Sequence, residues 1–199
     1  MPGRVLMVRA GLIVGPYDPT DRFTYWPRRV AQAGVVLAPG RPERQIQLIH
    51  ARDLADWIVR MAEAQQTGVY NVTGPADILT MGQLLETCRA ATASDAQFVW
   101  VDETFLLEHD VAPFTDLPLW LPEAANGLLR MNIDRALAAG VTFRSLADTI
   151  TETLAWDQRR AATPDTKARR LASGVPQRAG LAPARETALL AAWHARAGA

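Results

Sequence analysis

The chain has 199 residues, a length that suits one domain or one and a half. Its 21 Lys and Arg residues balance 21 Asp and Glu residues, so the net charge is zero and nucleic-acid binding through bulk electrostatics is excluded. Hydrophobic residues make up 49% of the chain, which predicts a globular protein with a substantial core, and the lack of an apolar run of about eighteen residues argues against a membrane span.

In the first third of the chain, an apolar, β-branched run over residues 5–8 predicts a buried strand that leaves through a glycine-rich turn, 9–16. Two prolines make the next segment a loop. Residues 23–33 are then expected to form a helix ended by Gly34, and residues 35–38 a short strand.

The middle of the chain continues to alternate strands and helices. Residues 45–50 alternate polar and apolar at their start and predict a half-exposed strand, and a helix with one apolar face follows over 51–64. Residues 68–72 predict a strand closed by Thr73-Gly74-Pro75. Thr80 and Gln83 have the spacing of a capping box. A strand over 98–101 and a short helix capped by Asp102 complete this part.

The last third is expected to be mostly helical. Residues 113–122 are proline-rich and apolar, which favours a packed loop. A short helix over 133–139 and a longer one that begins after Ser145 should follow. We expect three units: a body over 1–159, a linker over 160–180, and a C-terminal helix over 181–199. Lys167, the only lysine, falls in the linker and is expected to be a surface residue.

This alternation predicts an α/β class, with a partial Rossmann-like sheet that holds late strands only and a smaller, mostly helical substrate-binding region. The strand over 5–8 is too apolar for a sheet edge. It should have a neighbour on each side, and the chain offers few parallel partners, so we expect the beginning of the sheet to be missing from these residues.

Most catalytic motifs are absent from the sequence. It contains no G-x-G-x-x-G turn, no P-loop and no G-x-S-x-G elbow, and His50, His109 and His194 are too far apart for a predicted zinc site. Tyr25 and Arg29 have the spacing of a Tyr-x-x-x-Lys pair, but arginine does not reproduce the role of that lysine, so we assign no catalytic residue and no metal ligand.

Three segments resemble one protein family. The segment 8–16, Val-Arg-Ala-Gly-Leu-Ile-Val-Gly-Pro, is similar to the R-P-x-x-V-x-G-P stretch of extended short-chain dehydrogenase/reductases, the NAD(P)-dependent epimerase/dehydratase family. The segments 39–55 and 68–74 resemble that family's R-x-F-I-H-V-x-D-L-A and G-x-Y-N-[VI]-G stretches, in the same order. The loop over 18–26 looks most like bacterial reductases of the isoflavone-reductase-like kind.

The resemblance implies that the chain corresponds to the second half of such an enzyme, because the family's cofactor turn and Tyr-x-x-x-Lys belong to the first half. Leu12, Ile13 and Val14 would then lie against the nicotinamide of NAD or NADP. Four further residues would face a small-molecule substrate: Phe23, Tyr25, Trp26 and Gln47. Three of them have an alternative role: Tyr25 and Trp26 could pack in the core, and Gln47 could be an outward-facing strand residue. No tight cofactor binding is expected from this chain alone.

Departures from the family pattern argue against a nucleotide-sugar substrate. Leu12 and Ile46 stand where sugar-nucleotide epimerases have an asparagine and a diphosphate-binding arginine, and Arg44 would point to the same face of the strand as Ile46. A fragment, a mis-started reading frame and a degenerate relative all fit the sequence.

Two other functions stay open. One is a non-enzymatic binding module derived from the family. The other is a cofactor-independent hydrolase or isomerase that uses Asp18, Asp21 or His50, although these residues also suit loop capping and a helix start. We expect self-association through an open sheet edge and no membrane partner. The single cysteine, Cys88, and the lack of a recognisable secretion signal favour the cytoplasm.

Overall fold

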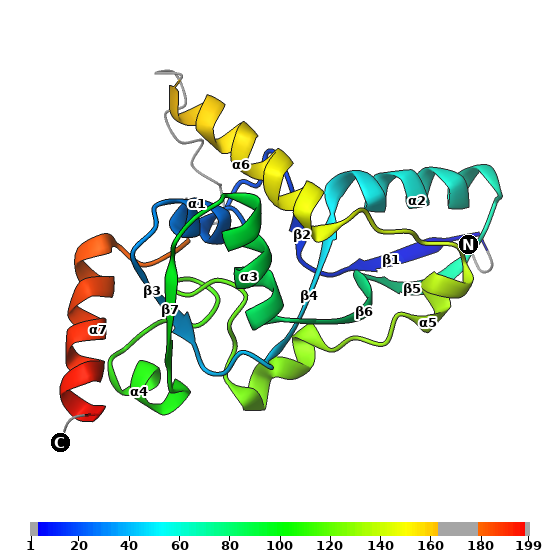
Figure 1. Ribbon diagram of the computed structural model, residues 1–199. Helices are drawn as coiled ribbons and strands as arrows, with labels where there is room; N and C mark the ends of the chain where they lie inside the picture. The colour runs from blue at the N-terminus through cyan, green and yellow to red at the C-terminus, as the bar shows by residue number, and fades with distance from the viewer. Residues whose placement is uncertain (1–3, 163–178, 198–199) are drawn as a thin grey trace.

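The computed structural model describes residues 4–162 and 179–197 and places strands and helices in alternation along the chain (Figure 1). The strands are β1 (Leu6–Ala10), β2 (Ile13–Val14), β3 (Val35–Pro39), β4 (Gln45–His50), β5 (Gly68–Val72), β6 (Gly74–Thr80) and β7 (Gln97–Val101). The helices are α1 (Tyr25–Ala31), α2 (Ala51–Glu63), α3 (Met81–Ala91), α4 (Glu103–Glu108), the 3-10 helix η1 (Glu123–Leu129), α5 (Asp134–Ala138), α6 (Leu146–Ala162) and α7 (Pro183–Ala197).

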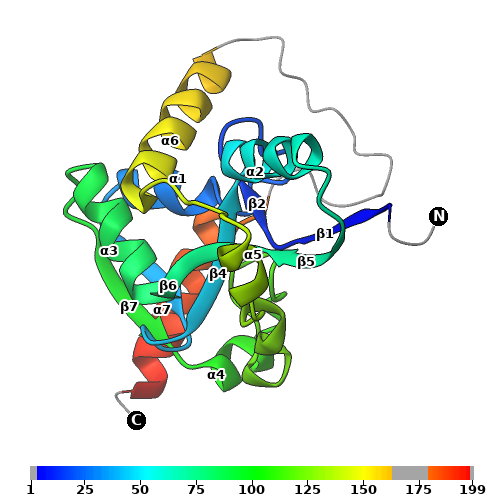
Figure 2. The same ribbon diagram turned by 90° about the vertical axis from the view of Figure 1, so that its right-hand side faces the viewer.

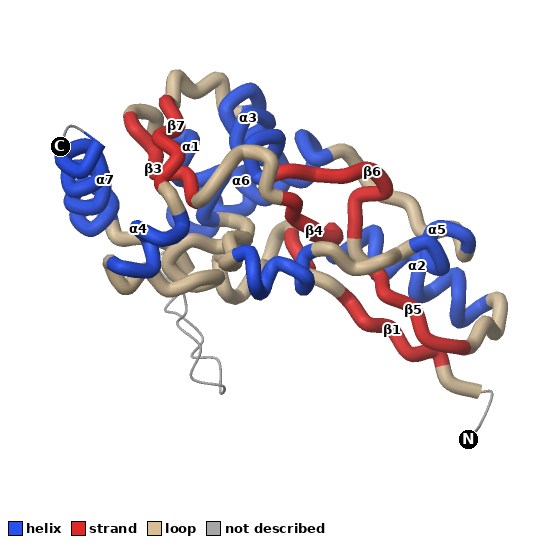
Figure 3. Tube along the Cα trace, turned by 90° about the horizontal axis from the view of Figure 1, so that it is seen from below, coloured by secondary structure: helices blue, strands red, loops and turns tan. Residues whose placement is uncertain are grey.

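The strands form three small sheets. β1 pairs with β5 in parallel, β3 pairs with β7 in parallel, and β4 lies between β2 and an antiparallel β6. Figure 3 shows β1 and β5 at one end of the molecule and β3 and β7 at the other, with β4 between them. The α/β class and the partial, late-strand sheet predicted from the sequence are therefore confirmed.

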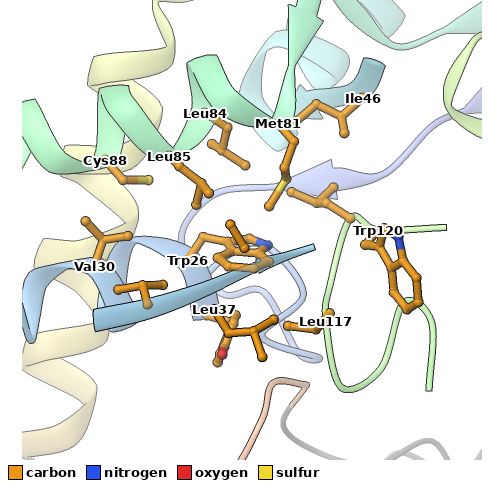
Figure 4. Close-up of a cluster of buried hydrophobic side chains, with 14 of the residues drawn as sticks. Trp26, Val30, Leu37, Ile46, Met81, Leu84, Leu85, Cys88, Leu117 and Trp120 are labelled. Atoms are coloured by element: carbon orange, nitrogen blue, oxygen red, sulfur yellow. The ribbon is translucent and has the colours of Figure 1, made fainter. Parts of the chain in front are cut away.

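The main core lies between β3, α1 and α3, and its large side chains come from segments far apart in the sequence (Figure 4). Trp26 has no exposed surface, and its indole Nε1 donates to the carbonyl of Pro118 at 2.8 Å. Leu117 and Trp120, from the same proline-rich loop, are also buried, so this segment is a packed loop as expected. Cys88 is buried in this core too, and burial raises the pKa of its thiol.

A second, smaller core fixes β1 and β5 against α2. Figure 2 shows the two strands extending from the body with α2 lying along them. Trp57 of α2 packs edge-on against Tyr70 of β5 with ring centroids 5.4 Å apart, and its Nε1 donates to the carbonyl of Ala139 just after α5. Leu6 and Val8 face the same cluster. Leu6 and Val8 of β1 are thus partly covered, whereas Ala10 at the end of the strand is exposed.

The opposite side of this sheet is open. Among the described residues β1 pairs only with β5, and Met7 and Val69, which are directly opposite each other, expose 49% and 38% of their surfaces. Arg135 of α5 donates to the carbonyl of Val69, so the outer edge of β5 has a partner. The sequence prediction of a buried strand over residues 5–8 is therefore wrong: in the described part of the chain β1 is an edge strand whose side chains are half-buried or exposed.

Three local expectations need correction. β4 is almost fully buried rather than half-exposed, because it is the central strand of its sheet. The segment after Thr73 does not simply close a strand: it forms β6, which covers one edge of β4 with a register shift between Ile46 and Leu48. The 3-10 helix η1 was not predicted, since its short Ala-Asn-Gly-Leu run has no clear helical period.

α6 runs to Ala162, past residue 160, where the linker was expected to start. Ion pairs connect α6 to α1 and to the loop before α1. Arg28 of α1 donates to Asp157 of α6 and to Asp21 of the preceding loop, at 2.6–3.0 Å. α7 packs on β3, where the Glu186 carboxylate accepts from the Leu37 amide and from Arg29. Most of the predicted linker, including Lys167, lies outside the described residues.

The capping box at the start of α3 provides a test of the local structure. Thr80 Oγ1 accepts from the Gln83 amide and the Gln83 side chain accepts from the Thr80 amide. We expect Thr80→Ala to lower the free energy of unfolding by about 1 kcal/mol, because a helix amide loses its acceptor, and Thr80→Ser to preserve it. Urea denaturation would measure both, with Thr87→Ala on the same helix as the control. Equal stability of Thr80→Ala and wild type would contradict this role.

Candidate functional site

An apolar pocket with a volume of about 460 Å³ opens at the carboxyl end of β1. This volume falls within the roughly 300–1,000 Å³ typical of small-molecule sites. The pocket is lined by residues of the β1–β2 turn, the proline-rich loop and η1: Gly11, Leu12, Phe114, Leu121, Leu128 and Leu129. Ligands of open α/β sheets bind beyond the carboxyl ends of the strands, which is where this pocket lies.

The turn that forms the pocket floor requires a glycine. A Cβ atom on Gly11 would lie 2.3 Å from Thr73 Oγ1 and 2.5 Å from Thr73 Cβ, too close for any side chain. The Gly11 amide donates to the carbonyl of Val72 at 3.2 Å, which continues the β1–β5 ladder into the turn. The backbone therefore comes close enough to β5 to place Leu12 at the pocket wall.

The three residues predicted to face the cofactor have different environments. Leu12 lines the pocket, and the neighbouring Ile13 exposes 47% of its surface. Val14 is buried in β2, paired with His50 of β4. Their predicted contact with a nicotinamide stays a prediction, and Leu12 and Ile13 are the two with surface available for it.

The residues predicted to bind substrate have structural partners of their own. Phe23 and Trp26 have no exposed surface, and Tyr25 packs edge-on against Trp26 with ring centroids 4.9 Å apart. The Gln47 side chain is not directed outward: it donates to the carbonyl of Met131 and accepts from its amide, at 2.9 and 2.7 Å. All four side chains thus have packing or hydrogen-bonding roles within the fold. The predicted role of Phe23, Tyr25, Trp26 and Gln47 in substrate binding stays a prediction.

The Tyr25 and Arg29 spacing does not form a proton-transfer pair. Arg29 is paired with Glu186 at 2.7 Å. Burial, together with the charge of Glu186, raises the pKa of Tyr25, whereas a phenol that shuttles protons needs a lowered pKa. The sequence interpretation of this spacing as non-catalytic agrees with the structure.

The three candidate acid–base residues also have structural contacts. Asp18 accepts hydrogen bonds from Thr20, Phe23 and Thr24, which makes it a loop-capping acid. Asp21 pairs with Arg28. His50 Nδ1 accepts from the Arg52 amide at the start of α2, and burial, with the charge of Arg144, lowers the pKa of His50. The pocket beside His50 has a volume of only about 30 Å³.

The cations near η1 are neutralised within the protein. Arg44 is 4% exposed, pairs with Glu103, and donates to the carbonyl of Leu121 at 3.0 Å. Glu123 receives both Arg44 and Arg130, at 3.2 and 3.1 Å. Arg44 is therefore not available to bind a diphosphate, as the departure at Ile46 also suggested.

The residues that form the other side of the pocket do not follow from the sequence patterns. Phe114 and Leu121 were assigned to a packed loop, and Leu128 and Leu129 were not singled out. The available signal in the sequence is the apolar pair Leu128-Leu129 directly after Asn-Gly, which suits no regular element. In the structure Leu128 exposes 70% of its surface. In the described ranges 4–162 and 179–197, no group of side chains could hold a metal ion, and no helix could span a membrane.

The close approach of Gly11 to Thr73 can be tested directly. Gly11→Ala should lower the free energy of unfolding by about 1–3 kcal/mol, because the turn must move away from β5 to make room for the methyl group. Gly127→Ala is the matched control, since no atom lies within 4 Å of the added Cβ. Urea denaturation of both variants would measure the difference, and a Gly11→Ala variant as stable as the control would show that the approach is not required.

No protein-family model and no curated protein sequence matches this chain, but several solved structures do. RMD from Pseudomonas aeruginosa, complexed with NADPH, matches with a TM-score of 0.55 and 18% identity over 78% of this chain and 48% of that one. The human epimerase family protein SDR39U1 with NADPH gives 0.54 and 20%, over 76% and 48%. UDP-glucose 4-epimerase from Thermotoga maritima with UDP-glucose gives 0.53 and 16%, over 77% and 46%.

This chain therefore spans about half the length of each of these structures. The likeness confirms the fold that the sequence resemblance implied. The chain has a partial Rossmann-like fold, corresponding to one half of the fold of NAD(P)-dependent epimerase structures.

Proposed function

We propose that this chain is the substrate-binding portion of an NAD(P)-dependent oxidoreductase of the epimerase/dehydratase type, acting on a small substrate that is not a nucleotide. The observation that carries the proposal is the apolar pocket at the carboxyl end of β1, next to the Gly11–Leu12 turn. The structures that share this fold include two with NADPH. We also propose a cytoplasmic location, consistent with a single, buried cysteine.

In this proposal the chain provides position and a dry environment. The bound cofactor would supply hydride transfer to or from a carbon of the substrate. The Gly11–Leu12 turn would lie against the nicotinamide ring, and the leucine side chains opposite it would exclude water. None of the six residues that line the pocket is titratable, so the proton donor or acceptor would come from outside them.

Two features support a substrate other than a nucleotide sugar. Arg44 is paired with glutamates, and Ile46 is buried in the core with no exposed surface. An anionic diphosphate would thus have to break existing ion pairs to be held there. The apolar lining favours a smaller and more apolar molecule.

The non-enzymatic alternative also has support, namely the open edge of β1 with its exposed Met7. Such a surface suits a module that acts by association. A turnover assay in the presence of a separately supplied nucleotide-binding half would separate the two. Activity that appears only in the mixture favours the oxidoreductase, and stable association without activity favours the module.

The first test is cofactor binding to the purified chain. We expect no binding of NADH or NADPH at micromolar concentrations, because the open sheet would need further strands and a phosphate-binding turn to hold a dinucleotide. Titration followed by nicotinamide fluorescence measures this directly, with a complete epimerase as the positive control. A micromolar dissociation constant would contradict the proposal that this chain alone does not bind the dinucleotide tightly.

The second test concerns the open sheet. The chain should self-associate as its concentration rises, because Met7 and Val69 leave an apolar face beside an unpaired edge. Met7→Lys should shift the equilibrium to the monomer, and Ile78→Lys, at a position 69% exposed on β6, should not. Sedimentation velocity would report both, and a wild-type chain that stays monodisperse and monomeric at all concentrations would count against this face.

A further inference from the structure

Arg22 lies over an aromatic ring of the apolar pocket, and none of the described residues is its anionic partner. The guanidinium carbon of Arg22 lies 5.2 Å from the centroid of the Phe114 ring, and Phe114 lines the pocket. A guanidinium stacked on a ring keeps its N–H donors in the plane free. Within residues 4–162 and 179–197, no residue accepts a hydrogen bond from the Arg22 side chain, and none forms an ion pair with it.

The other arginines around the pocket differ in this respect. Arg44 and Arg130 are both paired with carboxylates, as described above. Arg9, which has no ion pair among the described residues, is exposed on the open side of β1, two residues before Gly11. Arg22, by contrast, is half-buried. Its guanidinium lies over the Phe114 ring, and no carboxylate among the described residues pairs with it.

Both members of the stacked pair are held by their backbones. Asp21, directly before Arg22, has a φ of 58° and is fixed by its ion pair with Arg28. Phe114 has a φ of 62°, and its amide donates to the carbonyl of Trp120 at 3.0 Å. Left-handed backbone at two residues that are not glycine costs free energy, which the surrounding contacts offset. The backbone that carries each member of the pair is thus fixed, and the Arg22 guanidinium rests on the Phe114 ring.

We infer that the pocket binds an apolar carboxylate, with its hydrocarbon body against Leu121, Leu128 and Leu129 and its carboxylate on the Arg22 guanidinium. This inference rests on the proposed function, since it names the substrate class of the same pocket. A planar carboxylate matches the two parallel N–H donors of a guanidinium. The apolar walls would disfavour a molecule that carries charge at more than one end.

The experiment uses the full chain and two probes that differ only in charge, 4-phenylbutyrate and 4-phenylbutyramide. Binding is measured by calorimetric titration. Wild type should bind the carboxylate at least about fivefold more tightly than the amide, as for a partly exposed ion pair. Arg22→Leu should bring this ratio to about one and leave the amide affinity within about twofold, because only the charged contact is lost. Arg22→Lys should give an intermediate ratio.

Two further variants make the result specific. Arg89→Leu is the matched control, because Arg89 also stacks on a phenylalanine, Phe98, but lies on α3 outside the pocket, so the ratio should not change. Leu128→Trp, at an exposed position, should weaken both probes by filling the pocket.

Each contrary outcome has one meaning. Equal affinities for the two probes, both weakened by Leu128→Trp, would overturn the carboxylate inference and leave the pocket as the binding site. Loss of the preference in Arg9→Leu but not in Arg22→Leu would also overturn it. Failure of both probes to bind wild type would overturn the inference together with the pocket of the proposed function.

Discussion

β1 and β5 pair in parallel from Leu6 opposite Gly68 to Ala10 opposite Val72, and the position of the pocket depends on this pairing. Parallel strands end at the same edge of a sheet, so the turn after β1 and the segment after β5 must meet there. They meet at Gly11 and Thr73, so closely that no side chain fits at Gly11. The pocket wall at Leu12 follows from this contact.

The same pairing leaves the molecule asymmetric. α2 and α5 cover one side of the β1–β5 sheet through Trp57 and Tyr70, whereas the side that carries Met7 and Val69 is open. Purely parallel sheets are normally covered on both faces, because their strands are apolar on both. The matched part of this chain covers 48% of each of two structures that share this fold.

The ionic side chains of the described residues are mostly paired within the fold. The buried or half-buried ionic groups of the body are matched in pairs, such as Arg28 with Asp157 and Arg29 with Glu186, because an unpaired charge in a low-dielectric interior is costly. Around the pocket, Arg44 and Arg130 follow this rule and Arg22 does not. An unmatched cation beside an apolar cavity suits a partner that arrives from outside the chain.

Local patterns determined much of the fold. The residues of α2, the capping box of α3 and the strands at 45–50 and 68–72 follow from periodicity and short-range hydrogen bonding, which a sequence contains in full. Three short motifs also indicated a late-strand Rossmann-like sheet, as the solved structures confirm. The proline-rich loop was recognised as packed because its apolar residues could not be exposed together.

The tertiary structure decided the rest. Tyr25 and Trp26 suit a pocket wall and a core equally well by sequence, and only the tertiary packing shows that both side chains are buried in the main core. Gln47 and Arg44 found partners more than seventy residues away, at Met131 and Leu121, which no local pattern encodes. Phe114 and Arg22 likewise meet only because two distant loops fold together. Helices and turns are decided by neighbours in sequence, whereas a pocket is decided by neighbours in space.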